Sequence, residues 1–241
     1  MKISAFSYTN RGGRDHNEDS IRCRIEGQRG VFVVADGLGG HQCGEVASAL
    51  AADTLLDGCL QAETVDADAL TTLFRDANAK ILEQQSQPGQ EGMKTTAALL
   101  CLEDDRVLRA HIGDSRVYHF SGGALASVTG DHSVTYKKYL GGEISYMDVY
   151  HDDDRSSLLR VLGKPTCQPE TEAETAAPGD AFVLCSDGFW EFVYNEEMLL
   201  DLSKASSPQH WAELMLLRHI RRIPPGNDNF SLITVFVEER T

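Results

Sequence analysis

Residues 30–60 read GVFVVADGLGGHQCGEVASALAADTLLDGCL, and this stretch contains the strongest structural signals in the chain. The run GVFVVAD at 30–36 predicts a strand that ends on Asp36, the first residue of an Asp-Gly pair, which is a common turn signal. A glycine-rich turn follows, and residues 44–60 then have the composition of a helix. This order resembles a dinucleotide-binding unit, but the third glycine of that fingerprint falls on Gln42, and Asp36 would place a negative charge beside the pyrophosphate. The local charge therefore argues against a dinucleotide site.

Further strands and helices are predicted on both sides of this stretch. Apolar runs bounded by turn residues predict strands at 3–9, 96–103, 107–113, 116–120, 180–186 and 231–239. Helical periodicity or composition predicts helices at 66–87, 195–205 and 207–223, the last opening with Ser207 and Pro208. Between about 133 and 160 the periodicity fades, which we interpret as a short flap on the surface. No linker or repeat divides the chain, so we expect residues 1–241 to form a single α+β domain.

Composition excludes several classes of protein. Apolar residues make up 41% of the chain and charged residues 24%, an ordinary balance for a globular protein. The net charge of −15 would repel a phosphate backbone, so no nucleic-acid partner is expected. No run approaches the roughly 18 apolar residues of a membrane helix, and no signal peptide is evident. The six cysteines contain no Cys-x-x-Cys pair, which predicts reduced thiols in a cytoplasmic protein without membrane attachment.

Four aspartates stand where predicted strands begin or end. They are Asp36, Asp114, Asp187 and Asp228. Because strand ends converge at the rim of a sheet, these carboxylates could meet at one edge, where they would repel each other unless a divalent cation were shared. An all-oxygen set without His or Cys suits Mg²⁺ or Mn²⁺. Each aspartate alone is better explained as a turn residue, but the four together, with Glu18 and Asp19 upstream, indicate a candidate metal site.

A covalent nucleophile is not indicated by any motif. Cys23 and Arg29 have the Cys-x5-Arg spacing of cysteine phosphatases, but Glu26 between them would oppose a phosphate in the amide cradle. The chain has no Gly-x-Ser-x-Gly elbow and no Gly-Lys-Ser/Thr phosphate loop. None of these motifs therefore supports a covalent nucleophile, and the residues by themselves indicate only a possible metal site.

An ordered set of short motifs carries a family resemblance. The motifs are Arg14-Asp-His-Asn-Glu-Asp19, Val34-Ala-Asp-Gly-Leu-Gly-Gly-His41 with Gly44-Glu45, Gly92-Met-Lys-Thr-Thr96, Ile112-Gly-Asp-Ser-Arg116, Thr129-Gly-Asp-His-Ser133, Ser186-Asp-Gly188 and Asp228-Asn229. In this order, over about residues 8 to 237, the chain resembles the metal-dependent serine/threonine protein phosphatases of the PPM type, in their bacterial form. The resemblance implies a four-layer α-β-β-α sandwich of two antiparallel sheets flanked by helices. More weakly, it points to phosphatases associated with type VI secretion.

The resemblance also implies a set of metal ligands. Asp36 would bridge two ions, Mn²⁺ or Mg²⁺, with the backbone carbonyl of Gly37 on one of them. Asp187 and Asp228 would hold the other ion, and Asp114 with Asp187 would form a weaker third site. A hydroxide that bridges the metals would then attack phosphoserine or phosphothreonine without a covalent intermediate.

Other residues are implied to support the ligands and the substrate. Glu18 and Asp19 would act through water or from behind the ligands, and Asn229 would support the turn. Arg14 would grip the substrate phosphate, although an ion pair with Asp15 or Asp19 is the alternative for this side chain. Leu38 stands where many relatives have a histidine proposed as general acid, so the leaving-group proton would come from water or another side chain. His41, nearby in the sequence, is equally well explained as a structural hydrogen-bonding residue.

The function expected from this resemblance is that of a signalling enzyme. It would be a monomeric cytoplasmic phosphatase acting on a phosphorylated protein and opposing a serine/threonine kinase. Two alternatives remain open at this stage. One is a catalytically weak regulatory or binding module of the same fold, which would normally have lost a metal carboxylate, and the other is a phosphoesterase for small molecules.

Overall fold

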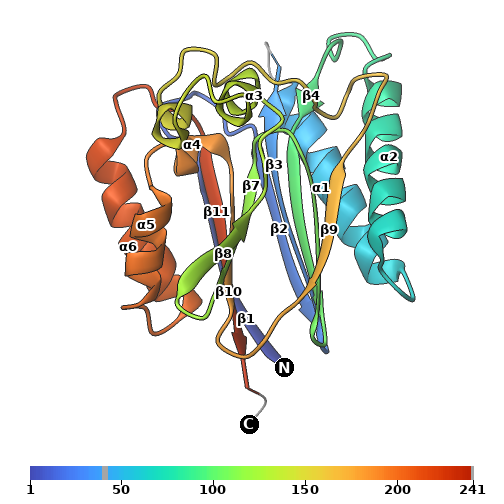
Figure 1. The fold of residues 1–241 in the computed structure, drawn as a ribbon. Coiled ribbons are helices and arrows are strands. Elements are labelled where there is room, and N and C mark those ends of the chain that lie inside the picture. The colour runs from blue at the N-terminus through green and yellow to red at the C-terminus, as the bar shows by residue number, and fades with distance from the viewer. Residues whose placement is uncertain (40–42, 240–241) are drawn as a thin grey trace.

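Two antiparallel β-sheets stack face to face, and helices cover the outer face of each sheet (Figure 1). The structure is a computed structural model, and it describes residues 1–39 and 43–239. The first sheet has the strand order β1 (Lys2–Asn10), β11 (Phe230–Glu238), β10 (Ala181–Cys185), β7 (Arg116–Ser121) and β8 (Ala124–Val128). The second has the order β2 (Asp19–Glu26), β3 (Arg29–Leu38), β5 (Ala97–Glu103), β6 (Arg106–Ile112) and β9 (Glu170–Thr175), and short β4 (Lys94–Thr95) pairs with β3.

The helices form the two outer layers and part of one end. The second sheet is covered by α1 (Gly44–Gln61) and α2 (Ala67–Gln84), and the first by α5 (Asn195–Leu202) and α6 (Pro208–Arg222). At the end of the sandwich that is uppermost in Figure 1 lie α3 (Val134–Leu140), the 3₁₀ helix η1 (Tyr146–Tyr150) and α4 (Asp187–Trp190). The α+β class and the four-layer sandwich implied by the sequence are confirmed.

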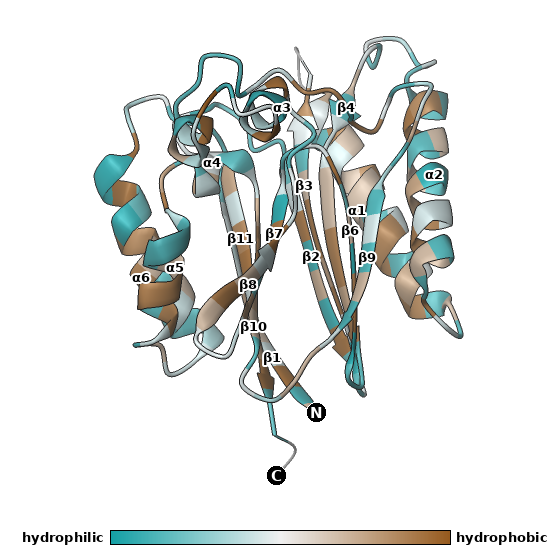
Figure 2. Cartoon of the chain, viewed as in Figure 1, coloured by the Kyte–Doolittle hydropathy of each residue, from teal (hydrophilic) through white to brown (hydrophobic). Residues whose placement is uncertain are grey.

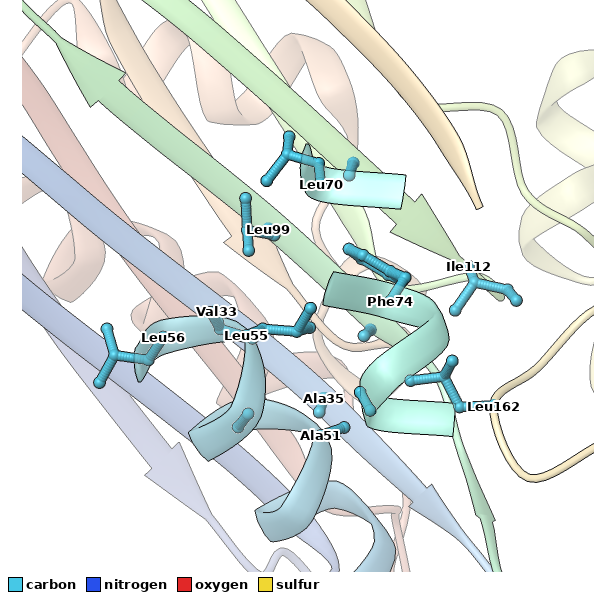
Figure 3. Packing of buried hydrophobic residues seen from close by; sticks show 14 of the residues in the cluster. Val33, Ala35, Ala51, Leu55, Leu56, Leu70, Phe74, Leu99, Ile112 and Leu162 are labelled. Atoms are coloured by element: carbon cyan, nitrogen blue, oxygen red, sulfur yellow. The ribbon is translucent and has the colours of Figure 1, made fainter. Parts of the chain in front are cut away.

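The unbroken apolar run in β3 follows from its position between two layers. Phe32 and Val34 face the other sheet, where they join the buried cluster between the sheets. Val33 and Ala35 face the opposite way and pack with residues of α1 and α2, such as Leu55 (Figure 3). A strand buried on both faces reads as a continuous apolar run instead of an alternating one. The same pattern makes hydrophobic residues dominate the middle strands in Figure 2, whereas α2 and α6 are of mixed character.

All seven predicted strands and four predicted helices are present, with ends shifted by a few residues. The start predicted for α6 is confirmed, because Ser207 Oγ accepts the backbone N–H of His210 at 3.1 Å and Pro208 is the first helical residue. The prediction missed β2 and β9, which carry many polar residues at exposed positions, and the five-residue strand β8, ALASV, in which no residue is buried. In β9, for example, the sequence ETEAET has no buried residue. It also missed α3 and η1 within the segment 133–160. Among the described residues, no helix combines the length and apolar character needed to cross a lipid bilayer.

Candidate metal centre

A cavity of about 620 Å³ lies at the end of the sandwich where β3 and β10 end. The described residues that line it are Arg14, Asp15, His16, Glu18, Asp36, Gly37, Leu38, Gly39, Ser156, Asp187, Asp228 and Asn229. Seven of these were predicted from the sequence as metal ligands, phosphate-binding residues or supporting residues. Asp19 and Asp114 do not line the cavity and are buried behind it, whereas His16 and Ser156 line it without having been predicted.

The strands deliver the carboxylates from distant parts of the chain. Asp36 lies in β3 directly opposite Asp19 of β2 in the sheet register. Asp187 is the first residue of α4, immediately beyond β10, and Asp228 stands two residues before β11. Asp114 begins the turn between β6 and β7. Strand ends from both sheets thus bring these side chains to one end of the molecule.

The carboxyl groups raise one another's pKa values. The pKa of Asp36 lies well above its usual value, mainly because the group is buried, and then because of the charges of Asp187, Asp19 and Asp114. Burial and the Asp228 charge raise the pKa of Asp187, and burial and Asp187 raise that of Asp114. Such a cluster is stabilised by protons or by cations.

Asp19 has an oxygen that lacks a partner. Its Oδ2 accepts hydrogen bonds from Ser186 Oγ at 2.8 Å and from Ser231 Oγ at 2.7 Å, so these two serines tie the sheets together at the site. Its Oδ1 is buried and has no hydrogen-bond partner within residues 1–39 and 43–239. Burial raises the pKa of Asp19 to about 7. A buried, unpaired oxygen among facing carboxyls fits hard divalent cations such as Mg²⁺ or Mn²⁺ and their water.

Two glycines let the backbone segments of the site approach each other closely. A Cβ added to Gly37 would lie 2.3 Å from the carbonyl oxygen of Gly44, and one added to Gly188 would lie 2.0 Å from that of Asn229. Any side chain at these positions would push apart the segments that carry Asp36, Asp187 and Asp228. The Asp-Gly pairs noted in the sequence are therefore needed for close backbone packing here.

Asn229 ties the loop that carries Arg14 to the metal end of β11. Its Nδ2 donates to the carbonyl oxygens of Arg11 at 2.8 Å and His16 at 2.9 Å. Its Oδ1 accepts the backbone N–H of Glu18 at 2.8 Å. The sequence suggested support of a turn, and the structure shows that the N-terminal loop is the segment held. Glu18 itself lines the cavity, and burial and the Asp228 charge raise its pKa.

Replacing Asn229 by alanine removes these three hydrogen bonds at once. Net contributions near 1 kcal/mol each predict a loss of about 2–3 kcal/mol in the free energy of unfolding, measured by urea titration. Because the loop with Arg14 loosens, we also expect a several-fold rise in KM for a phosphopeptide. Asn229→Asp keeps the acceptor but places a carboxylate oxygen against the carbonyl oxygens of Arg11 and His16, so its loss of stability should be at least as large as that of Asn229→Ala. A stability loss with unchanged KM would show that the loop does not position substrate.

Arg14 lies at the mouth of the cavity and pairs with a predicted metal ligand. Its Nη2 is 2.9 Å from Asp228 Oδ2, and the two side chains are 56% and 50% exposed. The alternative partners considered from the sequence, Asp15 and Asp19, form no ion pair with it among the described residues. Since a guanidinium has five donors, most of them are available to a ligand in the cavity.

The segment 133–160 borders the same cavity. Ser156 lines it, and Arg155 Nε binds Glu191 Oε1 at 2.8 Å, which holds the segment against the end of α4. Burial and the Asp187 charge raise the pKa of Glu191 to about 7. Leu38 lines the cavity and has no proton to donate. His41 lies outside the described residues.

A second group of possible metal ligands lies at the start of β9. His111, His132 and Glu170 each offer one possible ligand atom, and these three atoms lie within 4.8 Å of one another. However, His132 Nδ1 accepts the backbone N–H of Gly113 at 3.1 Å, so its Nε2 carries the proton and faces Glu170 at 3.2 Å. A neutral imidazole has one nitrogen lone pair available for a metal, and in His132 that lone pair accepts the hydrogen bond from Gly113. Burial lowers the pKa of His132 to about 4, and this histidine holds the turn that leads to Asp114.

Comparisons with known proteins identify the family and the fold. A family model described as protein phosphatase 2C matches residues 8–216. The serine/threonine phosphatase stp of Listeria monocytogenes is 31% identical, over 96% of this chain and 94% of that protein. The crystal structure of the Mycobacterium tuberculosis serine/threonine phosphatase PstP/Ppp is similar with a TM-score of 0.88 and 30% identity, covering 98% and 99% of the two chains. A crystal structure of the PstP catalytic domain in complex with two manganese ions has a TM-score of 0.86 and 29% identity, over 98% and 99%.

Proposed function

The chain belongs to the protein phosphatase 2C family, and we propose that Asp36, Asp187 and Asp228 are the carboxylates through which it works. The enzyme is a metal-dependent phosphatase of phosphoserine and phosphothreonine in proteins, with two Mn²⁺ or Mg²⁺ ions as cofactors. The observation that carries the residue assignment is the group of carboxyls gathered at the cavity, where desolvation and mutual repulsion raise the pKa values of Asp36 and Asp187. All the predicted carboxylate ligands are present, which disfavours a non-catalytic module.

Each carboxylate has a proposed place in the site. Asp36 would hold both ions, with the carbonyl of Gly37 as a further ligand for one of them, and Asp187 and Asp228 would hold the other. Asp114 and Asp187 would offer a weaker third site. When bound, the ions neutralise charge on the phosphate and lower the pKa of water in the site. No side chain needs to form a covalent bond to phosphorus.

The remaining residues prepare the cavity for substrate. Arg14 presents a planar guanidinium that can bind two phosphate oxygens, and Asn229 holds its loop. Glu18 and Asp19 would contact the ligating side chains instead of the ions, or would act on the ions through water. Because Leu38 cannot donate a proton, the leaving hydroxyl takes its proton from water or from another side chain.

The direct test is phosphate release from a phosphothreonine peptide by metal-stripped protein. We expect release only after Mn²⁺ is added, and none with EDTA. Nucleotides and sugar phosphates, assayed in parallel, should be poorer substrates if proteins are the substrate class. Release without metal would contradict the two-metal assignment.

Replacing Arg14 by alanine should mainly weaken substrate binding. Loss of a charge-assisted, bidentate contact predicts a rise in KM of about tenfold, with kcat within about threefold of the wild-type value. Arg14→Lys should restore only part of the binding, since an ammonium group lacks the planar fork. Steady-state kinetics with the same peptide separates the two parameters. A fall in kcat alone would mean that Arg14 acts on the chemical step instead.

The raised pKa values predict how metal and pH act together. Asp19 titrates at about 7 instead of its ordinary 3.8, and the pKa values of Asp36 and Asp187 are also raised. An acid with a raised pKa in the folded state contributes stability at low pH that is lost as pH rises through that pKa. Metal-free protein should therefore lose stability between about pH 4 and 7, and Mn²⁺ should raise the melting temperature more at pH 8 than at pH 6. Thermal melts with and without Mn²⁺ check this, and an equal metal effect at both pH values would contradict it.

The cellular setting is also proposed. A serine/threonine kinase must form the phosphoprotein substrate, which places the enzyme in a signalling pair. A cytoplasmic location is supported by the six cysteines, none of which forms a disulfide. Action as a monomer, organisation as a single domain and an association with type VI secretion stay predictions, and size-exclusion chromatography with light scattering tests the first of these.

A further inference from the structure

A second cavity adjoins the one that holds the carboxylates. Its volume is about 380 Å³, and it shares Leu38, Gly39 and Ser156 with the first. Lys94 and Lys164 are the charged residues that line it, and no carboxylate of the described residues does so. The two neighbouring cavities therefore have opposite character, one acidic and one basic.

The two lysines lack partners in a protein that is rich in acids. Neither ammonium group forms an ion pair or hydrogen bond within residues 1–39 and 43–239, although both side chains are only partly exposed. Other lysines, such as Lys138 and Lys204, pair with aspartates. With a net charge of −15, the protein has acidic groups in excess, yet none lines this cavity beside the two cations. Two unpaired cations in one cavity form an attractive site for an anion.

The backbone fixes both lysines relative to the metal strand. Lys94 lies in β4, where it pairs with Leu38 of β3, the strand that carries Asp36. Lys164 follows an isolated bridge between Thr95 and Leu162, so it lies near the same strand. Only the lysine side chains need to become ordered when an anion binds, which limits the entropic cost.

Asn78 of α2 holds the backbone that carries Lys164. Asn78 Nδ2 donates to the carbonyl oxygen of Lys164 at 3.0 Å, and Asn78 Oδ1 accepts the N–H of Gly163 at 2.7 Å. The lysine is thus held in place by a buried side chain of a long helix.

We propose that Lys94 and Lys164 form a subsite for a second anionic group, a carboxylate or a phosphate, on the substrate protein close to the phosphorylated residue. This inference rests on the proposed function. An extended chain advances about 3.3–3.6 Å per residue, so neighbouring cavities accept residues a few positions apart. The acidic surface otherwise repels such segments, and the two lysines offset that repulsion locally. The subsite therefore favours acidic or multiply phosphorylated segments.

Phosphothreonine peptides that differ only in their flanks test the subsite. One peptide has neutral flanks, and the others carry a glutamate or a second phosphothreonine within three positions on either side. With Mn²⁺-loaded enzyme, we expect kcat/KM to be about fivefold higher for the best acidic peptide than for the neutral one, as for a charge-assisted contact. In Lys94→Ala/Lys164→Ala this ratio should fall to about one. Lys137→Ala, at an exposed lysine of α3, is the matched control and should keep the ratio of the wild type.

Charge reversal gives a second, independent readout. Lys94→Glu/Lys164→Glu should prefer peptides with lysine flanks, which a loss of folding could not produce. A ratio of one in the wild type, or a ratio unchanged in the double alanine variant, would overturn the subsite. If sulfate alters turnover of the neutral peptide through these lysines while flanks have no effect, the cavity binds a free anion and the subsite proposal is wrong. If no peptide is hydrolysed under any metal, the proposed function fails instead.

Discussion

Asp36→Asn abolishes turnover while the fold is retained: kcat falls on the order of 10³-fold or more, as expected when charge stabilisation at the reacting phosphate is lost. Asn has nearly the same shape as Asp, and the side chain lies in β3 in register with Asp19, so the strand pairing does not change. What is lost is the negative charge between two proposed cation sites. No other carboxylate takes its place, because Asp187 and Asp114 have their own proposed ions to hold.

The same substitution has an opposite effect on the metal-free protein. Asp36 lies among like charges at the cavity, and desolvation together with those charges raises its pKa. Removing that charge relieves repulsion, so metal-free Asp36→Asn should be at least as stable as metal-free wild type. Mn²⁺ should then raise its melting temperature much less than it raises that of the wild type.

The measurements are kinetics on a phosphothreonine peptide and thermal melts with and without Mn²⁺. Asp57→Asn, at an exposed position of α1, is the matched control and should behave as wild type in both. Retention of more than about a tenth of the activity would overturn the bridging role of Asp36. Loss of activity together with loss of the fold would be inconsistent with the near-identical shapes of the two side chains.

Arg116→Met is expected to cause the largest loss of stability, about 3–5 kcal/mol, as for a broken buried ion pair. Arg116 is 1% exposed and binds Asp131 in a two-pronged fashion, with Nε to Oδ1 at 2.8 Å and Nη2 to Oδ2 at 2.6 Å. Its guanidinium also lies 3.5 Å from the ring centre of Trp190. Without Arg116, the carboxylate of Asp131 is left buried with no counter-charge.

This pair also supports the metal site. Trp190 ends α4, the short helix that begins at Asp187, and its Nε1 donates to the carbonyl oxygen of Asp114 at 2.9 Å. Loss of the guanidinium beneath the indole should therefore lower activity as well as stability. The ion pair between Arg116 of β7 and Asp131, which follows β8, is thus connected through Trp190 to two proposed ligands, Asp114 and Asp187.

A double-mutant cycle separates the energy of the Arg116–Asp131 ion pair from the cost of leaving the Asp131 carboxylate buried without a counter-charge. Arg116→Met/Asp131→Leu removes both charges and should recover a large part of the stability lost in Arg116→Met alone. Urea unfolding monitored by tryptophan fluorescence supplies the free energies. A single-variant loss below about 1 kcal/mol, or a double variant less stable than the single, would contradict the predicted cost of the unpaired charge.

Sequence patterns predicted the elements whose apolar residues are buried. The strand at 31–35 was evident because both of its faces are covered. Strand β9 was not predicted because it is an edge strand with exposed, acidic residues. A pattern of apolar residues cannot indicate a strand that has no buried residue. Helix α3 escaped because only one of its seven residues, Thr135, is buried.

The candidate ligands could be named from the sequence because their motifs are local and their order along the chain is specific. Contacts between those motifs could not, since they join residues far apart in the chain. Arg14 and Asp228, for instance, are 214 positions apart, and Glu18 and Asn229 are 211 apart. The bonds from Ser186 and Ser231 to Asp19 cross from one sheet to the other and have no signature in either segment.

By itself, then, the sequence determined the α+β class, the sheet elements with buried faces, the family and the set of acidic residues, because hydrophobic period and short motifs are properties of neighbouring residues. Only the tertiary structure decided the partner of Arg14, the anchoring of the N-terminal loop by Asn229, and the basic cavity of Lys94 and Lys164 beside the acidic one. The packing of the two sheets brings distant segments of the chain together. The pKa of each titratable group then depends on how deeply it is buried and on which charged groups lie beside it.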